Sequence, residues 1–255
     1  MERIGTGSPL FSFADVRLRV LPILTVAFLL FLALLADALS SSFGQRFFNA
    51  SQMRSSPWML YYVGHTGLLI STLILIYLMS RGHPGKFGLR LPVGISYVPA
   101  ALLWGLSFGL IMTLIDYLPN ILHHAAPDFS LSSRNVVGWL SFEGLYAGTV
   151  EEILFRGLLV SYLMTRISGR IHAGSFSLHV AGVLVALLFC LSHIGSFADR
   201  PFWMALGQQV YAFIWAVFYA YWYEKSGSLL APIIGHNIGN VVEYCFVFLM
   251  VARWR

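Results

Sequence analysis

The sequence predicts an all-α membrane protein, a polytopic helix bundle of seven to eight transmembrane helices. Two observations support this fold class. Of the 255 residues, 58% are hydrophobic and only 11% are charged, and the mean hydropathy is +0.74. Soluble domains carry about 25% charged residues, and a chain of this length has too little interior to bury so much apolar surface. The same composition excludes a disordered chain.

Seven apolar segments follow one another, each with about the 20 residues that a helix needs to cross hydrocarbon. Backbone groups in lipid must be satisfied within their own segment, so we expect helices. A β-barrel is excluded because runs such as VAFLLFLALL do not alternate. The fourth segment either stays whole or breaks near Gly144–Gly148, which gives seven or eight helices. The segments are 18–39, 58–79, 93–118, 136–165, 178–198, 201–222 and 228–252.

These segments leave no room for a soluble domain, so we expect one integral membrane domain over residues 1–255, with a motif-bearing core at about 136–252. The first segment resembles a signal peptide in its Arg17 and Arg19, but its apolar run is too long, and we expect an uncleaved helix. Sixteen Lys and Arg against eleven Asp and Glu give a net charge of +5. The cations lie between apolar segments, so they indicate orientation in a bilayer and not nucleic-acid binding.

Charged residues inside apolar segments are candidate functional residues because a charge at a helix centre costs roughly 2.5–3.5 kcal/mol. The strongest group is EEILFR at 151–156. Glu152 and Arg156 are four residues apart, so they share a helix face and can pair. Glu151 points elsewhere and remains free for chemistry. A purely structural Glu–Arg clamp would leave Glu151 without a partner.

Two histidine motifs follow in later segments, FCLSH at 189–193 and HNIGN at 236–240. His193 is suited to proton transfer near neutral pH, although a lone membrane histidine is more often structural. His236 and Asn240 are one helical turn apart and share a face. The alternative for this pair is hydrogen bonding between helices.

Four further ionisable residues lie in or near apolar segments without a spaced partner. Solvation at a helix end is the expected state of Asp37 and Asp116. Glu143 is about 80° from Glu151 in an α-helix, so it does not clearly share its face. His65 is a weaker candidate for contact with the site.

A carboxylate, two histidines and an amide on three helices can build a hydrolytic site around a cavity in the membrane. The carboxylate and one histidine can deprotonate water, and the other histidine and the amide can donate to an oxyanion. The chain has neither a GxSxG nor an HExxH motif, which argues against serine hydrolases and zincins. Zinc bound by Glu151, His193 and His236 remains an alternative, but we expect no metal or other cofactor.

The three motifs resemble, in order, the EExxxR, FxxxH and HxxxN motifs of the CPBP family, also called the CAAX protease and bacteriocin-processing or Abi family. They read EEILFRG at 151–157, FCLSH at 189–193 and HNIGN at 236–240, and the resemblance covers about residues 150–245. It implies a glutamic-type intramembrane endopeptidase with about eight helices and a conical cavity open to membrane and cytoplasm.

The resemblance also implies the role of each motif residue. Glu151 would be the base that activates water, with His193 as its partner. His236 and Asn240 would polarise the scissile carbonyl. The site would be organised by the remaining charged pair, Glu152 and Arg156.

The partners implied by this resemblance are a membrane-anchored protein or peptide substrate and the lipid bilayer, and no nucleic acid. The compact chain resembles bacterial members, so we expect a multi-pass protein of the bacterial inner membrane, for which prenylated substrates are less expected. Two other functions remain open. One is a catalytically silent scaffold or immunity protein of the same family, and the other is a proton-coupled transporter, although no inverted repeat is detectable.

Overall fold

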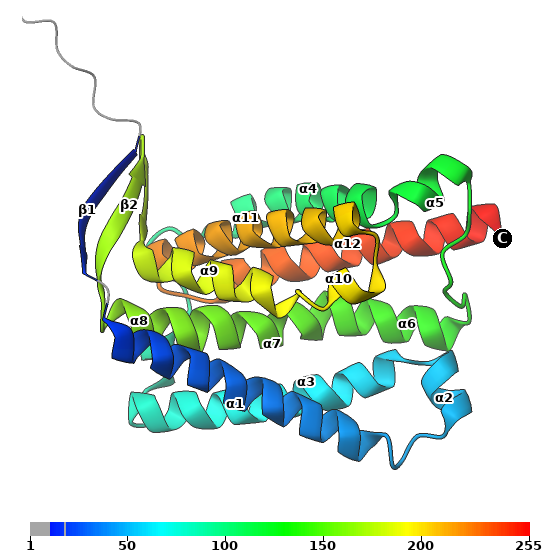
Figure 1. The fold of residues 1–255 in the computed structure, drawn as a ribbon, viewed down its shortest axis with the longest axis horizontal. Helices are drawn as coiled ribbons and strands as arrows, with labels where there is room; N and C mark the ends of the chain where they lie inside the picture. Colours follow the sequence, from blue (N-terminus) through cyan, green and yellow to red (C-terminus); the bar gives the residue numbers. More distant parts are fainter. Residues whose placement is uncertain (1–10, 18) are drawn as a thin grey trace, which may run out of the picture.

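The computed structural model describes residues 11–17 and 19–255. Within this part of the chain the protein is mostly helical, as predicted, and seven long helical segments run side by side with alternating direction (Figure 1). They are α1 (Val20–Gly44), α3 (Trp58–Ser80), α4 (Val98–Asp116), a central run over residues 133–164, α9 (Val180–Ser192), α11 (Phe202–Ser226) and α12 (Leu230–Trp254).

Short helices occupy the connections between the long segments. In α2 (Ala50–Ser55), the side chain of Asn49 accepts from the backbone of Gln52 at 2.9 Å, and the Gln52 side chain accepts from the backbone of Asn49 at 3.0 Å. This reciprocal capping satisfies two amide groups at the helix start. The other short helices are η1 (Pro84–Phe87), α5 (Leu118–His123) and α10 (Ser196–Asp199).

The fourth apolar segment forms one continuous central run, so the break that the sequence suggested near Gly144–Gly148 is absent. Glycine serves close packing here. A Cβ on Gly144 would lie 2.4 Å from Val241, and a Cβ on Gly148 would lie 2.4 Å from Asn237, both on α12. The run alternates α-helical and π-helical turns: α6 (Ser133–Ser141), η2 (Phe142–Ala147), α7 (Gly148–Glu152), η3 (Ile153–Val160) and α8 (Ser161–Met164).

Five helices among the described residues are long and apolar enough to cross a membrane. The protein is therefore an integral membrane protein, but the predicted count of seven or eight spanning helices is not confirmed. The two remaining long segments, the central run and α11, carry more polar side chains. The five candidates are Val20–Gly44, Trp58–Ser80, Val98–Asp116, Val180–Asp199 and Leu230–Trp254.

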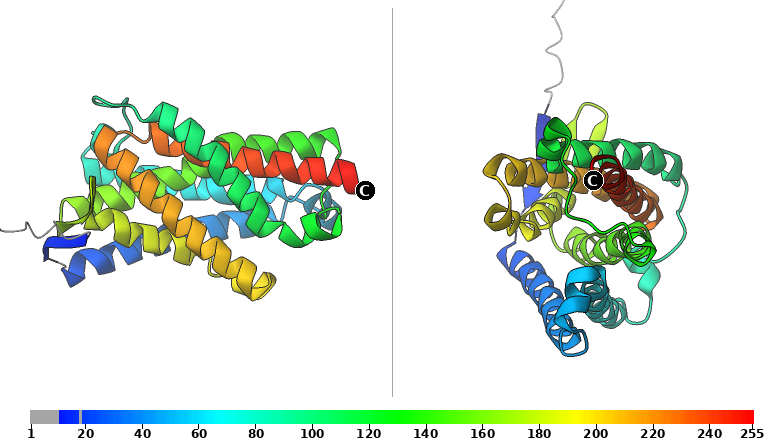
Figure 2. Two further views of the ribbon diagram at one scale, coloured as in Figure 1. Left: turned by 90° about the horizontal axis from the view of Figure 1, so that it is seen from above. Right: turned by 90° about the vertical axis from the view of Figure 1, so that its right-hand side faces the viewer.

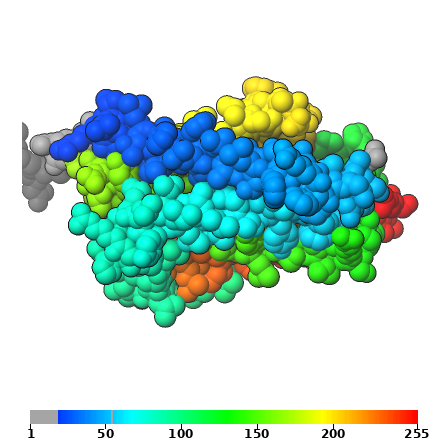
Figure 3. Space-filling model, turned by 90° about the horizontal axis from the view of Figure 1, so that it is seen from below, coloured from blue at the N-terminus to red at the C-terminus, as the bar shows by residue number. Residues whose placement is uncertain are grey.

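The central run lies between two groups of helices (Figures 1 and 2). On one side, α1 and α3 lie next to each other and cover the lower face of the molecule, as Figure 3 shows. On the other side lie α4, α11 and α12, with α9 packed beside the run. The main hydrophobic core forms around the run, where Leu154, Leu158 and Leu159 are fully buried. The charged motif EEILFR at 151–156 therefore lies at the centre of the bundle.

Helices α4 and α12 approach each other through glycines. A Cβ on Gly105 would lie 2.8 Å from the carbonyl oxygen of Gly235, and one on Gly109 would lie 2.5 Å from that of Gly239. Small residues let two helix backbones come this close in a membrane. The glycines beside His236 therefore hold α12 against α4 and fix the direction in which its polar face points.

A three-stranded antiparallel sheet at one end of the bundle was not predicted. Strand β1 (Phe11–Arg17) pairs with β2 (Ser168–Ala173), which forms a hairpin with β3 (Phe176–His179). The hairpin turn places Gly174 at φ +57°, a left-handed conformation that glycine adopts without strain. The strands have only four to seven residues, so the much longer apolar runs dominated the pattern of the sequence.

Glu224 on α11 ties this sheet to the bundle. Its Oε1 lies 2.5 Å from Nη2 of Arg170 on β2, and its Oε2 accepts from the backbone N–H of His179 at 2.8 Å. Burial lowers the pKa of His179, although the Glu224 carboxylate opposes this shift. A neutral His179 ring then accepts from the N–H of Ala181 at 3.1 Å and caps α9.

The alternation of helices places residues 81–97 and 165–179 at the same end of the bundle (Figure 1). We expect Lys86→Cys and Ser175→Cys to react with an impermeant maleimide from the same side of the membrane, and Ser51→Cys to react from the opposite side. Cys245 is exposed, so each variant is made in a Cys245→Ser background. Labelling of Lys86→Cys and Ser175→Cys from opposite sides would contradict this topology.

Candidate active site

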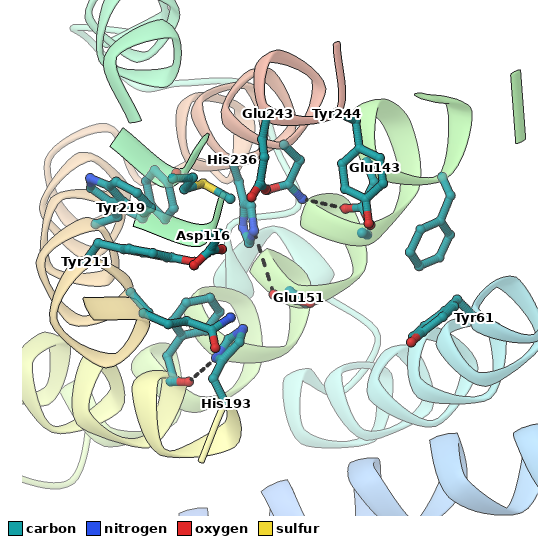
Figure 4. A pocket seen from close by; sticks show the side chains of 18 of the residues that line it. Tyr61, Asp116, Glu143, Glu151, His193, Tyr211, Tyr219, His236, Glu243 and Tyr244 are labelled. Atoms are coloured by element: carbon teal, nitrogen blue, oxygen red, sulfur yellow. Dashed lines mark hydrogen bonds and ion pairs between the residues drawn. The ribbon is translucent and has the colours of Figure 1, made fainter. Parts of the chain in front are cut away.

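A cavity of about 390 Å³ lies beside the central run, and all four residues predicted as catalytic line it (Figure 4). They are Glu151 on α7, His193 at the end of α9, and His236 and Asn240 on α12. The bundle therefore brings together side chains that are up to 89 positions apart, the distance from 151 to 240. Besides tyrosines, five further ionisable residues line the same space, namely His65, Asp116, Glu143, Arg200 and Glu243.

The Glu152–Arg156 pair forms as the sequence predicted. Arg156 Nη1 donates to Glu152 Oε1 at 2.9 Å, and the two side chains are 1% and 0% exposed. The guanidinium lies 4.8 Å from the ring centroid of Phe189 and 5.3 Å from that of Tyr219. These rings come from α9 and α11, so one buried cation connects three segments of the bundle.

His236 joins this pair from α12. Its Nδ1 lies 2.9 Å from Glu152 Oε1, and its ring stacks on Tyr219 with centroids 5.5 Å apart. Because a carboxylate only accepts hydrogen bonds, Nδ1 carries the proton. The contact leaves the other nitrogen, Nε2, directed to Glu151 Oε2 at 3.7 Å. Glu152 thus orients the imidazole that faces the neighbouring carboxylate.

Of the two adjacent carboxylates, Glu151 is more exposed and is held less closely by neighbouring side chains than Glu152 is. Its side chain is 22% exposed, whereas that of Glu152 is fully buried. No hydrogen bond within 3.5 Å is formed by Glu151 to any described side chain, while two histidine nitrogens lie 3.7 Å away. Of the two carboxylates, Glu152 is thus the one paired with Arg156, as the four-residue spacing predicted, and Glu151 is the one that lines the cavity.

His193 does not contact Glu151 directly. It follows the last turn of α9, and its Nδ1 lies 2.9 Å from the carbonyl oxygen of Phe189. A carbonyl only accepts, so Nδ1 carries the proton and Nε2 is left as an acceptor. His193 therefore lines the cavity near Glu151 without forming the direct contact that a paired base would show (Figure 4).

Asn240 is held by Glu143, a carboxylate that we did not expect at the site from the sequence. Its Nδ2 donates to Glu143 Oε2 at 2.9 Å. Glu143 reaches the cavity because it belongs to η2, and the i→i+5 turns of this π-helix rotate the chain less per residue on the way to Glu151 than an α-helix would. The expected angle of about 80° between Glu143 and Glu151 assumed a regular α-helix, and it is wrong for this reason.

His65 on α3 is the second residue that lies closer to the site than we expected from the sequence. Its Nε2 lies 3.7 Å from Glu151 Oε1, and its Nδ1 lies 3.6 Å from Asp37 Oδ1 on α1. Asp37 therefore does not sit at a solvated helix end. Neither residue has a motif around it, so only their position inside apolar segments signalled a function.

The far end of the cavity carries a second charged group, next to the loop between α10 and α11. Tyr211 Oη donates to Asp116 Oδ2 at 2.7 Å, and Arg200 Nη1 lies 3.0 Å from Asp116 Oδ1. Asp116 is thus buried and paired, contrary to the expected solvation. Burial alone would lower the pKa of Arg200, but the Asp116 carboxylate raises it overall. Burial also raises the pKa of Tyr117, next to this pair.

No group of three His, Cys, Asp or Glu within residues 11–17 and 19–255 has the geometry of a metal site. The zinc alternative of Glu151, His193 and His236 is therefore not among the residue groups with such a geometry.

The fold and the cavity define a helical membrane protein with acid–base side chains clustered inside the bundle. Residues 133–242 match the family model described as type II CAAX prenyl endopeptidase Rce1-like. This part of the chain, which carries all three motifs, belongs to the CAAX protease or CPBP family, as the motif resemblance indicated. No curated protein and no solved structure matches the chain.

The buried position of Arg156 predicts a structural effect of its loss. We expect Arg156→Ala to destabilise the fold by about 3–5 kcal/mol, because removal of one partner leaves a buried carboxylate unpaired. Folded yield and melting temperature in detergent measure this effect. The matched control is Arg166→Ala, which removes an exposed arginine from the end of the same segment. An Arg156→Ala variant that melts like the parent but has lost activity would instead require a direct chemical role for Arg156.

Proposed function

We propose that this protein is an intramembrane endopeptidase that hydrolyses a peptide bond of a membrane-associated protein or peptide with water activated by Glu151. The proposal rests on the different environments of two adjacent carboxylates, Glu151 and Glu152. Glu152 is buried and bound by Arg156 and His236, whereas Glu151 faces the cavity between two imidazoles. Membership of the CAAX protease family supports a peptidase.

Glu151 is suited to act as the base. In the proposed reaction, its carboxylate takes a proton from a water molecule while the water oxygen attacks the scissile carbonyl carbon. The carbonyl π electrons move to oxygen and form an oxyanion. When the oxyanion collapses, the C–N bond breaks and the proton passes to the leaving nitrogen, which regenerates the carboxylate.

His193, at the end of α9, would support this proton transfer from its own position in the cavity lining. Its Nδ1 proton is held by the Phe189 carbonyl, so the neutral ring offers Nε2 as an acceptor. This nitrogen can share the water proton with Glu151 and return it to the leaving amine. A water molecule between the two groups would account for the absence of a direct contact.

The oxyanion would be stabilised by donors from α12. Asn240 uses one N–H on Glu143, which orients the amide and leaves its second N–H for the substrate. His236 holds its Nδ1 proton on Glu152, so it donates from Nε2 only in its imidazolium form. Both residues lie on one face of α12, and their donors can meet at one oxygen.

The substrate class follows from the location of the site. A cavity inside a membrane bundle is accessible to chains that are anchored in the bilayer, and the matching family model is named for prenyl endopeptidases. The location in a bacterial inner membrane and the identity of the substrate stay predictions. A silent scaffold and a proton-coupled transporter are the competing functions. A scaffold requires no base at position 151, and a transporter that used Glu151 to carry protons would still generate no new peptide termini.

The deciding comparison uses Glu151→Gln, which keeps the shape of the side chain and removes the base. We expect the variant to accumulate and melt like the parent while turnover falls below detection, since a positioned base contributes about 10²–10⁴-fold. Terminal-peptide labelling of membranes that carry the parent or the variant measures the lost cleavage and identifies the substrate.

The control for this comparison is Asp199→Asn, which removes an exposed carboxylate from α10 and should leave cleavage at the parental rate. A Glu151→Gln protein that still generates the same terminal peptides would contradict the proposed mechanism. Identical membrane proteomes with the parent and the variant, combined with an unchanged biological effect, would favour the scaffold.

The two supporting roles predict different residual rates. We expect His193→Ala to abolish turnover, and Asn240→Ala to retain about 10⁻²–10⁻³ of it, the typical loss of one oxyanion donor. Initial rates on the identified substrate measure both. The matched control is Asn237→Ala on the same helix, whose amide donates to Thr149 and not into the cavity. Parental turnover by Asn240→Ala would remove this residue from the mechanism.

A further inference from the structure

Glu151 is flanked by a residue from outside the family-matched segment. His65 belongs to α3, whereas the match begins at residue 133. Its Nε2 faces Glu151 Oε1 at 3.7 Å, while His236 Nε2 faces Glu151 Oε2 at the same distance. Each oxygen of the proposed base thus has one imidazole in front of it. Within the described residues, His65 occupies the position beside Glu151 that the motif pattern assigned to His193.

The other nitrogen of His65 also faces a carboxylate. Nδ1 lies 3.6 Å from Oδ1 of Asp37 on α1. A neutral imidazole carries one N–H and can satisfy only one of two carboxylates, whereas an imidazolium donates to both. When His65 is protonated, its two N–H groups therefore match one acceptor on each of Asp37 and Glu151, and its positive charge lies between the two carboxylates. Both distances exceed a hydrogen bond, as is common for catalytic contacts before substrate binds.

The packing of α1 on α3 holds this arrangement in place. A Cβ on Gly64 would lie 2.7 Å from Asp37 Oδ1, and one on Gly67 would lie 2.7 Å from the carbonyl oxygen of Ala36. The two glycines stand on either side of His65 in the sequence and bring α3 close to α1 at this level. The ring of His65 also packs edge to face on Phe142, with centroids 5.0 Å apart.

His65 stands in the wall between two cavities. One is the cavity of Glu151, and the other, of about 410 Å³, is lined by Asp37 and Met53 together with His65 and Tyr61. Asp37 is 32% exposed on that side. The pair is thus accessible to small molecules from the side of α1 and α3, the helices that cover the bundle in Figure 3.

From this geometry we propose that Asp37 and His65 form a positioning pair for the base Glu151, an inference that rests on the proposed function. Asp37 orients the imidazole through Nδ1. The Nε2–H of His65 then holds Glu151 Oε1 and leaves Oε2, which faces His236, to take the proton from the water. The positive charge of His65 stabilises the ionised base. The N-terminal helices therefore complete an active site whose motifs all lie in the C-terminal half of the chain.

The test compares His65→Gln and His65→Ala, with kcat and KM measured separately on the substrate identified with Glu151→Gln. The glutamine amide can reach one carboxylate but carries no charge, so we expect kcat to fall about 10²-fold, the cost of a misplacement of about 1 Å. KM and melting temperature should change little. His65→Ala should lose more, and added imidazole should restore part of its kcat by entering the space beside Asp37.

Asp37→Asn and His83→Ala complete the set. Asp37→Asn should lower kcat in the same direction and by less than His65→Ala, and its loss should not add to that of His65→Ala in the double variant, because the two residues act as a unit. His83 is exposed in the connection between α3 and α4, and His83→Ala should retain the parental kcat.

A parental kcat in His65→Gln, or a loss that tracks only the folded yield and does not respond to imidazole, would overturn the positioning pair. If His65→Ala does not fold, the kcat of His65→Gln decides alone. The two proposals fail differently. An active Glu151→Gln variant removes the proposed function, whereas an inactive Glu151→Gln together with parental turnover in His65→Gln removes only the role of His65.

Discussion

The buried ion pair between Glu152 and Arg156 is the interaction on which the site depends. Two charges in a low-dielectric bundle are tolerated only when each compensates the other and the remaining donors and acceptors are used. Arg156 packs between the rings of Phe189 and Tyr219, and Glu152 also holds His236. The pair therefore fixes α9, α11 and α12 around the central run. Because Glu152 is occupied by these contacts, the adjacent Glu151 remains available for a separate role.

Much of the fold and of this pair could be predicted from the sequence because both rest on local spacing. Apolar runs of about 20 residues located the long helical segments, and the four-residue separation of Glu152 and Arg156 placed them on one face. Local spacing did not give the count of membrane-crossing helices, since the central run and α11 carry polar side chains that only tertiary packing accommodates. The sheet was not predicted because its strands are short and because β1 pairs with a strand far away in the sequence, with Phe13 opposite Ile171, 158 residues later.

The unpredicted parts of the site depend on geometry that spacing does not contain. Glu143 reaches Asn240 because the helix between Glu143 and Glu151 is locally π-helical, and no residue pattern marked that change. The contact of His65 with Glu151 depends on how closely α3 approaches α1 and the central run, which is a property of three segments together. The motif residues were found because they cluster in sequence, and their neighbours in space were missed because they do not.

The π-helical stretch Phe142–Ala147 also constrains how this chain can vary in length. A π-turn inside an α-helix is equivalent to one inserted residue. Deleting one residue here would let the stretch close into a regular α-helix while the turns on either side keep their orientation. Deleting one residue from the α-helical turns between Glu143 and Glu151 would instead rotate the preceding turns by about 100° and move Glu143 away from Asn240. Chains of this type that differ by one residue in the π-helical stretch would therefore keep the same cavity wall, whereas the same change in the α-helical turns would keep all three motifs and present a different wall to the substrate.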